Sequence, residues 1–113
     1  WAGLTEKELN EQSIRYNKAE FPWAANGRAM TMNATIGKTK ILTNIDKTQI
    51  LGIGIVGDNA GDLISEAMLA LEMNAIPDDI GMTIHPHPTL SETIAIASEI
   101  LTGSITELYI PKK

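Results

Sequence analysis

The stretch Ile50-Leu51-Gly52-Ile53-Gly54-Ile55-Val56-Gly57 matches the pattern G-x-G-x-x-G through its three glycines. This pattern is typical of the turn that binds a dinucleotide between a strand and a helix. That turn is tight, whereas isoleucine and valine are stiff, β-branched residues that favour extended strands. No parallel-strand pattern follows the next helix either. We therefore interpret residues 49–56 as a strand that is apolar on both faces, whose glycines mark close packing or a bulge.

Two further strands are predicted on the N-terminal side of this one. Residues 36–45 alternate roughly between polar and apolar side chains and are rich in β-branched residues, which favours a strand. Asn44, Asp46 and Lys47 supply a polar turn, so a hairpin is the economical connection to residues 49–56. Residues 13–21 alternate as well, and Pro22 is expected to end this strand.

Local capping signals predict two short helices in the N-terminal part of the chain. Thr5 and Glu8 have the spacing of a capping box, which predicts a helix that runs to about Gln12. Asn26 can cap a brief helix that extends through residue 30.

Three more helices are predicted after residue 57. Asp58 or Asn59 caps the first, whose apolar residues recur at the helical period: Ala60, Leu63, Ile64, Ala67, Met68 and Leu71. Pro77, followed by two acids, opens a shorter helix that residues 85–88 end. The last helix has an apolar face and stops at Gly103; its face consists of Leu90, Ile94, Ala97 and Leu101. The tail to Lys113 is expected to be short and partly extended.

Strands and helices are thus segregated along the chain, and this order predicts an α+β fold in which an antiparallel sheet carries helices on one face. The 113 residues form a single domain, residues 1–113, because this length is close to the commonest domain size.

Composition excludes several classes of function. The net charge of −5 and the lack of a basic cluster argue against a nucleic-acid partner. No apolar run reaches the roughly 18 residues of a membrane span, and the first residues lack the pattern of a secretory signal. The absence of cysteine excludes disulfides, thiolate zinc sites and thiol–disulfide chemistry by this chain alone. Because the chain opens on Trp1, we expect it to be a piece of a longer protein.

The segment His85-Pro86-His87-Pro88-Thr89-Leu90-Ser91-Glu92 is the part of the chain that is richest in chemistry. Thr89 and Glu92 have capping-box spacing, so the histidines could be ordinary loop residues before a helix. Alternatively, a histidine pairs with a carboxylate on the first helical turn, which fixes the tautomer and suits general acid–base catalysis without a metal. A zinc site is disfavoured because the prolines limit convergence of the two imidazoles and no third ligand is obvious.

Residues 87–92 resemble the active-site segment in the C-terminal domain of the pyridine nucleotide–disulfide oxidoreductases. With the preceding residues 83–85, they are most similar to the dihydrolipoamide dehydrogenase branch of that family. Pro86 stands where the family often has alanine, and it stiffens the loop between the histidines. Four other segments also resemble the family's dimerisation domain, namely residues 1–8, 21–29, 50–57 and 103–108.

The resemblance implies a reaction and roles for individual residues. The family branch oxidises dihydrolipoamide on the acyltransferase core of 2-oxo acid dehydrogenase complexes and passes electrons through a redox disulfide and FAD to NAD⁺. His87 matches the catalytic base that deprotonates the substrate thiol, and Glu92 matches its carboxylate partner. The main chain at His87 and Pro88 is expected to face the FAD of the partner subunit, with a cis peptide bond between these two residues.

The resemblance also implies partners. We expect a homodimer in the bacterial cytoplasm, with the lipoyl domain as substrate and with no nucleic acid, membrane or metal ion involved. The FAD- and NAD-binding domains are absent from this chain, so no cofactor is expected to bind to it alone.

Two other hypotheses remain open at this stage. The chain could be a stand-alone dimerisation or docking module whose histidines have lost their role. It could also be the same domain of a glutathione reductase, although those enzymes have a polar residue at the position of Leu90 and an acid at that of Thr93.

Overall fold

A four-stranded antiparallel sheet lies at the centre of the computed structural model, which describes residues 1–33 and 36–103. Its strand order is β1-β4-β3-β2, with β1 at Ala2–Gly3, β2 at Asn17–Pro22, β3 at Lys38–Thr43 and β4 at Ile50–Val56. The predicted tail after Gly103 lies outside the described residues, and Gly103 ends the last helix as predicted.

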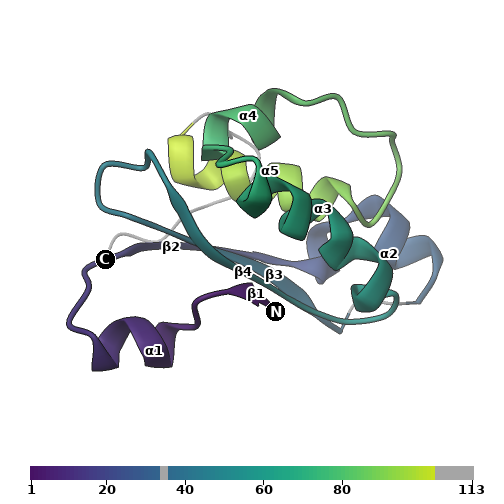
Figure 1. The fold of residues 1–113 in the computed structure, drawn as a ribbon. Coiled ribbons are helices and arrows are strands. Elements are labelled where there is room, and N and C mark those ends of the chain that lie inside the picture. The colour runs from purple at the N-terminus through teal and green to yellow at the C-terminus, as the bar shows by residue number, and fades with distance from the viewer. Residues whose placement is uncertain (34–35, 104–113) are drawn as a thin grey trace.

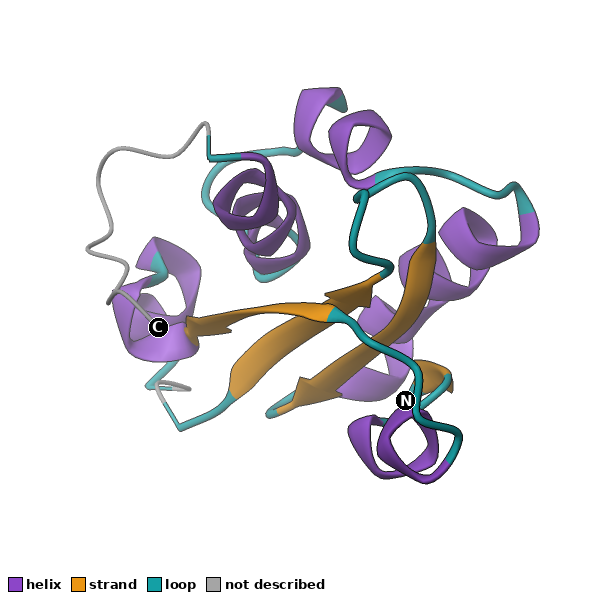
Figure 2. Cartoon of the chain, turned by 90° about the vertical axis from the view of Figure 1, so that its left-hand side faces the viewer, coloured by secondary structure: helices purple, strands orange, loops and turns teal. Residues whose placement is uncertain are grey.

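The helices lie on both sides of the sheet but are unequal in size (Figure 1). The larger layer contains α3, α4 and α5, which span Ala60–Glu72, Pro77–Met82 and Glu92–Thr102. The short helix α1, Glu6–Glu11, lies on the opposite side, and Figure 2 shows it below the strands beside the marked N-terminus. A 3₁₀ turn, η1 at Trp23–Ala25, leads from β2 into α2 at Gly27–Thr31. Within the described residues, no helix is both long and apolar enough to cross a membrane.

The strand interpretation of residues 49–56 is confirmed, and close packing accounts for two of the glycines. β4 pairs with β3 on one side and with β1 on the other. A Cβ atom at Gly52 would lie 2.0 Å from the carbonyl oxygen of Leu4, and one at Gly54 would lie 1.9 Å from the ring of Trp1. Only glycine lets the N-terminal segment lie so close to this strand.

The structure corrects two predictions about strands. The strand predicted to start at Ser13 starts at Asn17, because Ser13 has a φ of 55° and the Ile14 amide donates to the Leu9 carbonyl in a turn that ends α1. The sheet also has one strand more than predicted. β1 contains only two residues, Ala2 and Gly3, which is too short to show an alternating pattern.

Most predicted helix boundaries are confirmed. Thr5 and Glu8 form the capping box of α1, Asn26 caps α2 through a bond to the Ala29 amide, and α4 begins at Pro77. α3 begins directly after Asn59 as predicted, but this residue has a left-handed backbone and its side chain makes no capping bond.

A buried series of hydrogen bonds joins the sheet to the start of α5. The indole Nε1 of Trp23 donates to Thr39 Oγ1 over 3.1 Å, Thr39 Oγ1 lies 2.8 Å from Thr93 Oγ1, and Thr93 Oγ1 donates to the Leu90 carbonyl over 2.7 Å. Because an indole nitrogen only donates and a carbonyl only accepts, Thr39 must be the donor to Thr93. Both threonines have no exposed surface.

The substitution Thr39→Val tests the energetic weight of this series. It would leave the buried indole N–H of Trp23 without an acceptor, so we expect the free energy of unfolding to fall by about 1–3 kcal/mol. Thr31→Val is the matched control, since the Thr31 hydroxyl is exposed. Urea unfolding of both variants gives the comparison, and equal midpoints would contradict the prediction.

On the opposite face of the sheet, α1 is tied down by an ion pair. The carboxylate of Glu6 accepts hydrogen bonds from Lys40 and from the Tyr16 hydroxyl, and Lys18 Nζ lies 3.4 Å away. The hydrogen bond from Lys40 is the largest cause that lowers the pKa of Glu6 from 4.5 to about 2, against the opposing effect of partial burial.

This lowered pKa predicts a specific acid sensitivity. Glu6 stabilises the fold fully above its ordinary pKa of 4.5, and this stabilisation disappears as the pH falls toward 2. The variant Glu6→Gln should therefore lose less stability than the native chain between pH 4.5 and pH 2. Thermal unfolding across this range is the measurement, with Glu11→Gln at an exposed position of α1 as control. Parallel pH profiles for Glu6→Gln and the native chain would refute the assignment.

Candidate functional site

The candidate site is the loop between α4 and α5, which carries both histidines. The peptide bond between His87 and Pro88 is cis, as expected. The side chain of His85 contacts a carboxylate on α3, and that of His87 contacts a carboxylate on α5. The two imidazole rings therefore have no shared partner.

His87 is paired with Glu92, as predicted. Its Nδ1 atom lies 3.0 Å from each carboxylate oxygen of Glu92. A carboxylate only accepts hydrogen bonds, so Nδ1 carries the proton in the neutral ring and Nε2 is left with a free lone pair. The His87 side chain is 77% exposed, and its Nε2 makes no hydrogen bond within residues 1–33 and 36–103. The ring therefore presents a proton acceptor to whatever approaches it.

Glu92 is itself held in place by the main chain. One of its oxygens accepts a hydrogen bond from the Thr89 amide over 2.8 Å, and its side chain is only 20% exposed. This bond is one half of the capping box that the sequence predicts, but the other half is not formed. α5 begins at Glu92 rather than at Leu90, and the Thr89 hydroxyl donates to the Pro86 carbonyl instead of capping the helix. Glu92 thus supports the loop and the ring of His87 together.

Asn26 is a contributor to the site that sequence reasoning recognised only as a helix cap. The side chain is buried, and its Nδ2 donates over 3.1 Å to the carbonyl oxygen of Thr89, while its Oδ1 caps α2. The two residues are 63 positions apart, so no local pattern in the sequence indicates their contact.

His85 and Glu66 form a second pair that the sequence did not predict. His85 Nε2 lies 2.6 Å from Glu66 Oε2 on α3, and His85 Nδ1 lies 2.9 Å from the carbonyl oxygen of Thr83. The His85 side chain is 8% exposed. Glu66 lies on α3, whose apolar face the sequence predicts. The position of Glu66 in the sequence does not indicate a histidine partner 19 residues later.

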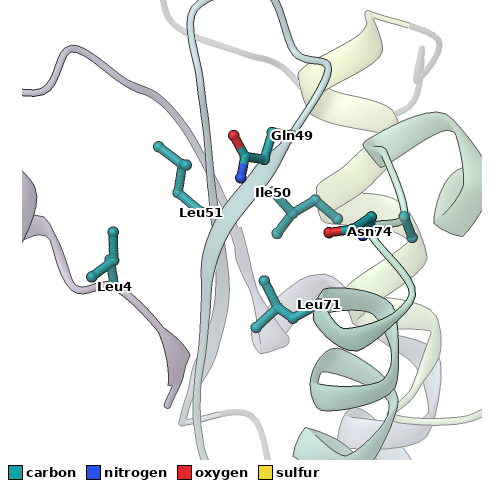
Figure 3. A pocket seen from close by; sticks show the side chains of 7 residues that line it. Leu4, Gln49, Ile50, Leu51, Leu71 and Asn74 are labelled. Carbon is teal, nitrogen blue, oxygen red and sulfur yellow. The ribbon is translucent and has the colours of Figure 1, made fainter.

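Two of the hollows in the described part of the fold border α3, and neither includes His87 in its lining. One, of about 200 Å³, lies between the start of β4 and the end of α3 and has no acidic or basic side chain in its lining (Figure 3). The other, of about 330 Å³, borders the site through Thr89, Leu90 and Ser91 and includes Arg28 and Asp62. Among the described residues, no three histidines or acids gather where they could hold a metal ion.

Comparison with known proteins extends the resemblance over the whole chain. A dihydrolipoyl dehydrogenase of Buchnera aphidicola from Schizaphis graminum is 50% identical over 113 residues, which are all of this chain and 24% of that protein. The dihydrolipoyl dehydrogenase of Haemophilus influenzae is 46% identical over 108 residues, or 96% of this chain and 23% of that protein. The chain thus spans about a quarter of the length of the curated relatives it matches.

A solved structure has the same fold, and a protein family matches most of the chain. The fold matches the structure of LpdA from Mycobacterium tuberculosis with a TM-score of 0.82 at 22% identity, covering 88% of this chain and 22% of that one. Residues 1–98 match the family described as pyridine nucleotide-disulphide oxidoreductase, dimerisation domain. With 98 of the 113 residues in the match, the chain belongs to that family.

Proposed function

We propose that this chain is the C-terminal interface domain of a bacterial, cytoplasmic dihydrolipoyl dehydrogenase, in which His87 is the acid–base residue and Glu92 orients it. The observation that carries the proposal is the pairing of His87 Nδ1 with both oxygens of Glu92, which leaves Nε2 free and exposed. Identities of 46–50% with dihydrolipoyl dehydrogenases support this branch of the family over glutathione reductase. The substrate in this proposal is dihydrolipoamide on the lipoyl domain of a 2-oxo acid dehydrogenase complex, whose acyltransferase core binds the enzyme.

In the proposed reaction, His87 moves one proton. Its Nε2 accepts the proton of a substrate thiol, which leaves a thiolate able to attack a disulfide. The ring then carries a positive charge, and the adjacent carboxylate of Glu92 stabilises that charge while holding the Nδ1 proton. The chain has no cysteine, so the disulfide that receives the electrons belongs to the FAD-binding part of the complete polypeptide.

The main chain of the same loop fits a flavin. The carbonyl oxygens of Pro86 and Thr89 accept hydrogen bonds from Thr89 Oγ1 and Asn26 Nδ2. Within the described residues, those of His87 and Pro88 accept none, so they could accept a hydrogen bond from the ring N–H of FAD. FAD supplies the two-electron acceptor between the disulfide and NAD⁺. Our proposal assigns these two carbonyls to the flavin of the partner subunit.

An exposed apolar surface supports the homodimer. Several large apolar side chains on α3 and α4, or within two residues of their ends, are more than half exposed, namely Met68, Leu69, Met73, Met82 and Ile84. Soluble monomers rarely expose such a group of side chains together, and a second copy of the same chain would cover it. Ile84 lies in the same loop as His87, so a dimer that covers this residue would bring the partner chain close to the site.

The tautomer of His87 tests the pairing directly. In the native chain, neutral His87 should carry its proton on Nδ1, because Glu92 accepts from that atom. In Glu92→Ala, the proton should redistribute between both nitrogens. Ring ¹⁵N NMR shifts report this distribution, and Glu99→Ala on the same helix is the control. An unchanged distribution in Glu92→Ala would mean that the carboxylate does not orient the ring.

Self-association tests the dimer surface. We expect the native chain to sediment as a dimer at tens of micromolar. The double variant Leu69→Glu/Met73→Glu should sediment as a monomer, because it places acids where apolar groups would meet their copies. Met30→Glu changes a methionine on α2 that is also more than half exposed, and it should leave the dimer intact. A native monomer under these conditions would count against the surface.

Enzyme activity tests the proposed role of His87. In the complete polypeptide, His87→Gln should lower kcat for dihydrolipoamide oxidation by roughly 10²–10⁴-fold, while the flavin spectrum stays unchanged. Glu72→Gln, on an exposed position of α3, is the control. The 113-residue chain alone should show no activity, since it lacks the cysteine pair, and no flavin colour, since the proposal places the FAD-binding domain in another part of the complete polypeptide. Full activity in His87→Gln with FAD bound would overturn the proposal.

A further inference from the structure

His85 makes a contact that the proposed reaction does not use. Its ring lies between two acceptors, the Thr83 carbonyl at 2.9 Å and the Glu66 carboxylate at 2.6 Å. Neither a carbonyl nor a carboxylate can donate, so both hydrogen bonds form when each ring nitrogen carries a proton. The bond to Glu66 joins a largely buried imidazole ring to a carboxylate on another element.

This contact attaches the loop to two helices. Glu66 lies in the middle of α3, and Thr83 is the residue that ends α4, where its own hydroxyl donates to the Asp79 carbonyl. His85 therefore fixes the first half of the loop against the helical layer. The second half is fixed independently, by the bonds of Thr89 to Asn26 and to Glu92.

The three residues between these anchors have little conformational freedom. Pro86 and Pro88 flank His87, and each proline ring fixes its own φ and restricts the residue before it. The Pro86 carbonyl is also bonded to the Thr89 hydroxyl. A displacement of His85 would therefore be transmitted to the backbone of His87, rather than absorbed by rotation in the loop.

We propose that Glu66 and His85 are a positioning pair, which holds the loop on α3 so that the His87 ring reaches Glu92 and presents Nε2 in one place. This inference rests on the proposed acid–base role of His87, and it assigns a purpose to the second, buried histidine. Neither Glu66 nor His85 touches the reacting atoms in this arrangement; they act through the backbone of His87.

The test removes the carboxylate that binds His85 and leaves His87 and Glu92 unchanged. Glu66→Ala deletes the carboxylate and keeps a strong helix former, so α3 is expected to remain folded. Although Glu66 makes no hydrogen bond with His87 or Glu92 in the described structure, the variant should shift the ring tautomer of His87 in ¹⁵N NMR away from Nδ1–H. The matched control Glu72→Ala removes an exposed carboxylate from the same helix and should leave the tautomer unchanged.

A conservative variant separates positioning from general loss of structure. In Glu66→Gln, an amide can still hydrogen-bond to His85, so the His87 tautomer should stay close to native. If Glu66→Ala fails to fold, His85→Asn provides the same comparison from the other side of the contact. A native-like His87 tautomer in a folded Glu66→Ala or His85→Asn chain would overturn the proposal.

Kinetics in the complete polypeptide provide a second readout. Glu66→Ala should lower kcat on the order of tenfold or more, since a small misplacement of a catalytic group is costly, and the KM for NAD⁺ should not change. Comparison with Glu92→Ala keeps the two proposals apart. If Glu92→Ala alters neither tautomer nor kcat, the acid–base proposal fails. If Glu92→Ala alters both and Glu66→Ala alters neither, only the positioning proposal fails.

Discussion

The start of α5 is fixed to the sheet by buried hydrogen bonds that run from Trp23 through Thr39 and Thr93 to the Leu90 carbonyl. The chemistry of the two ends sets their direction, because the indole only donates and the carbonyl only accepts. Breaking any link leaves a polar group unsatisfied in the core, which is more costly than the modest net gain of forming the bond. Glu92 is the neighbour of Thr93, so this series also determines where its carboxylate stands.

That fixed carboxylate is one of the groups that hold the loop. Glu92 bonds the Thr89 amide and the His87 ring, Asn26 bonds the Thr89 carbonyl, and Glu66 bonds His85. The loop is thus held from α2, α3 and α5, while the His87 ring itself stays exposed. Such support suits a group that must meet a substrate in one orientation, because the supporting bonds lie away from the exposed nitrogen.

Local signals in the sequence predicted the parts of the structure that are set locally. The strand at 49–56, the capping box at Thr5, the cap at Asn26 and the pairing of His87 with Glu92 involve residues close together in the chain. Long-range contacts gave no such signal. The bonds of Glu6 with Lys40, His85 with Glu66 and Asn26 with Thr89 span 34, 19 and 63 positions. The two-residue strand β1 likewise exists only because β4 has glycines where β1 and Trp1 approach it.

Hydrogen exchange at the Thr89 amide tests the central claim most directly, because this amide donates to Glu92 and belongs to no helix or strand. If Glu92 holds the loop as described, the amide should exchange about as slowly as amides within α5, such as that of Ser98. The amide of Ile84 lies in the same loop and makes no hydrogen bond to any of the described residues, so it should exchange fast. Exchange of Thr89 as fast as that of Ile84 would contradict the account, since the carboxylate would then not be fixed beside His87.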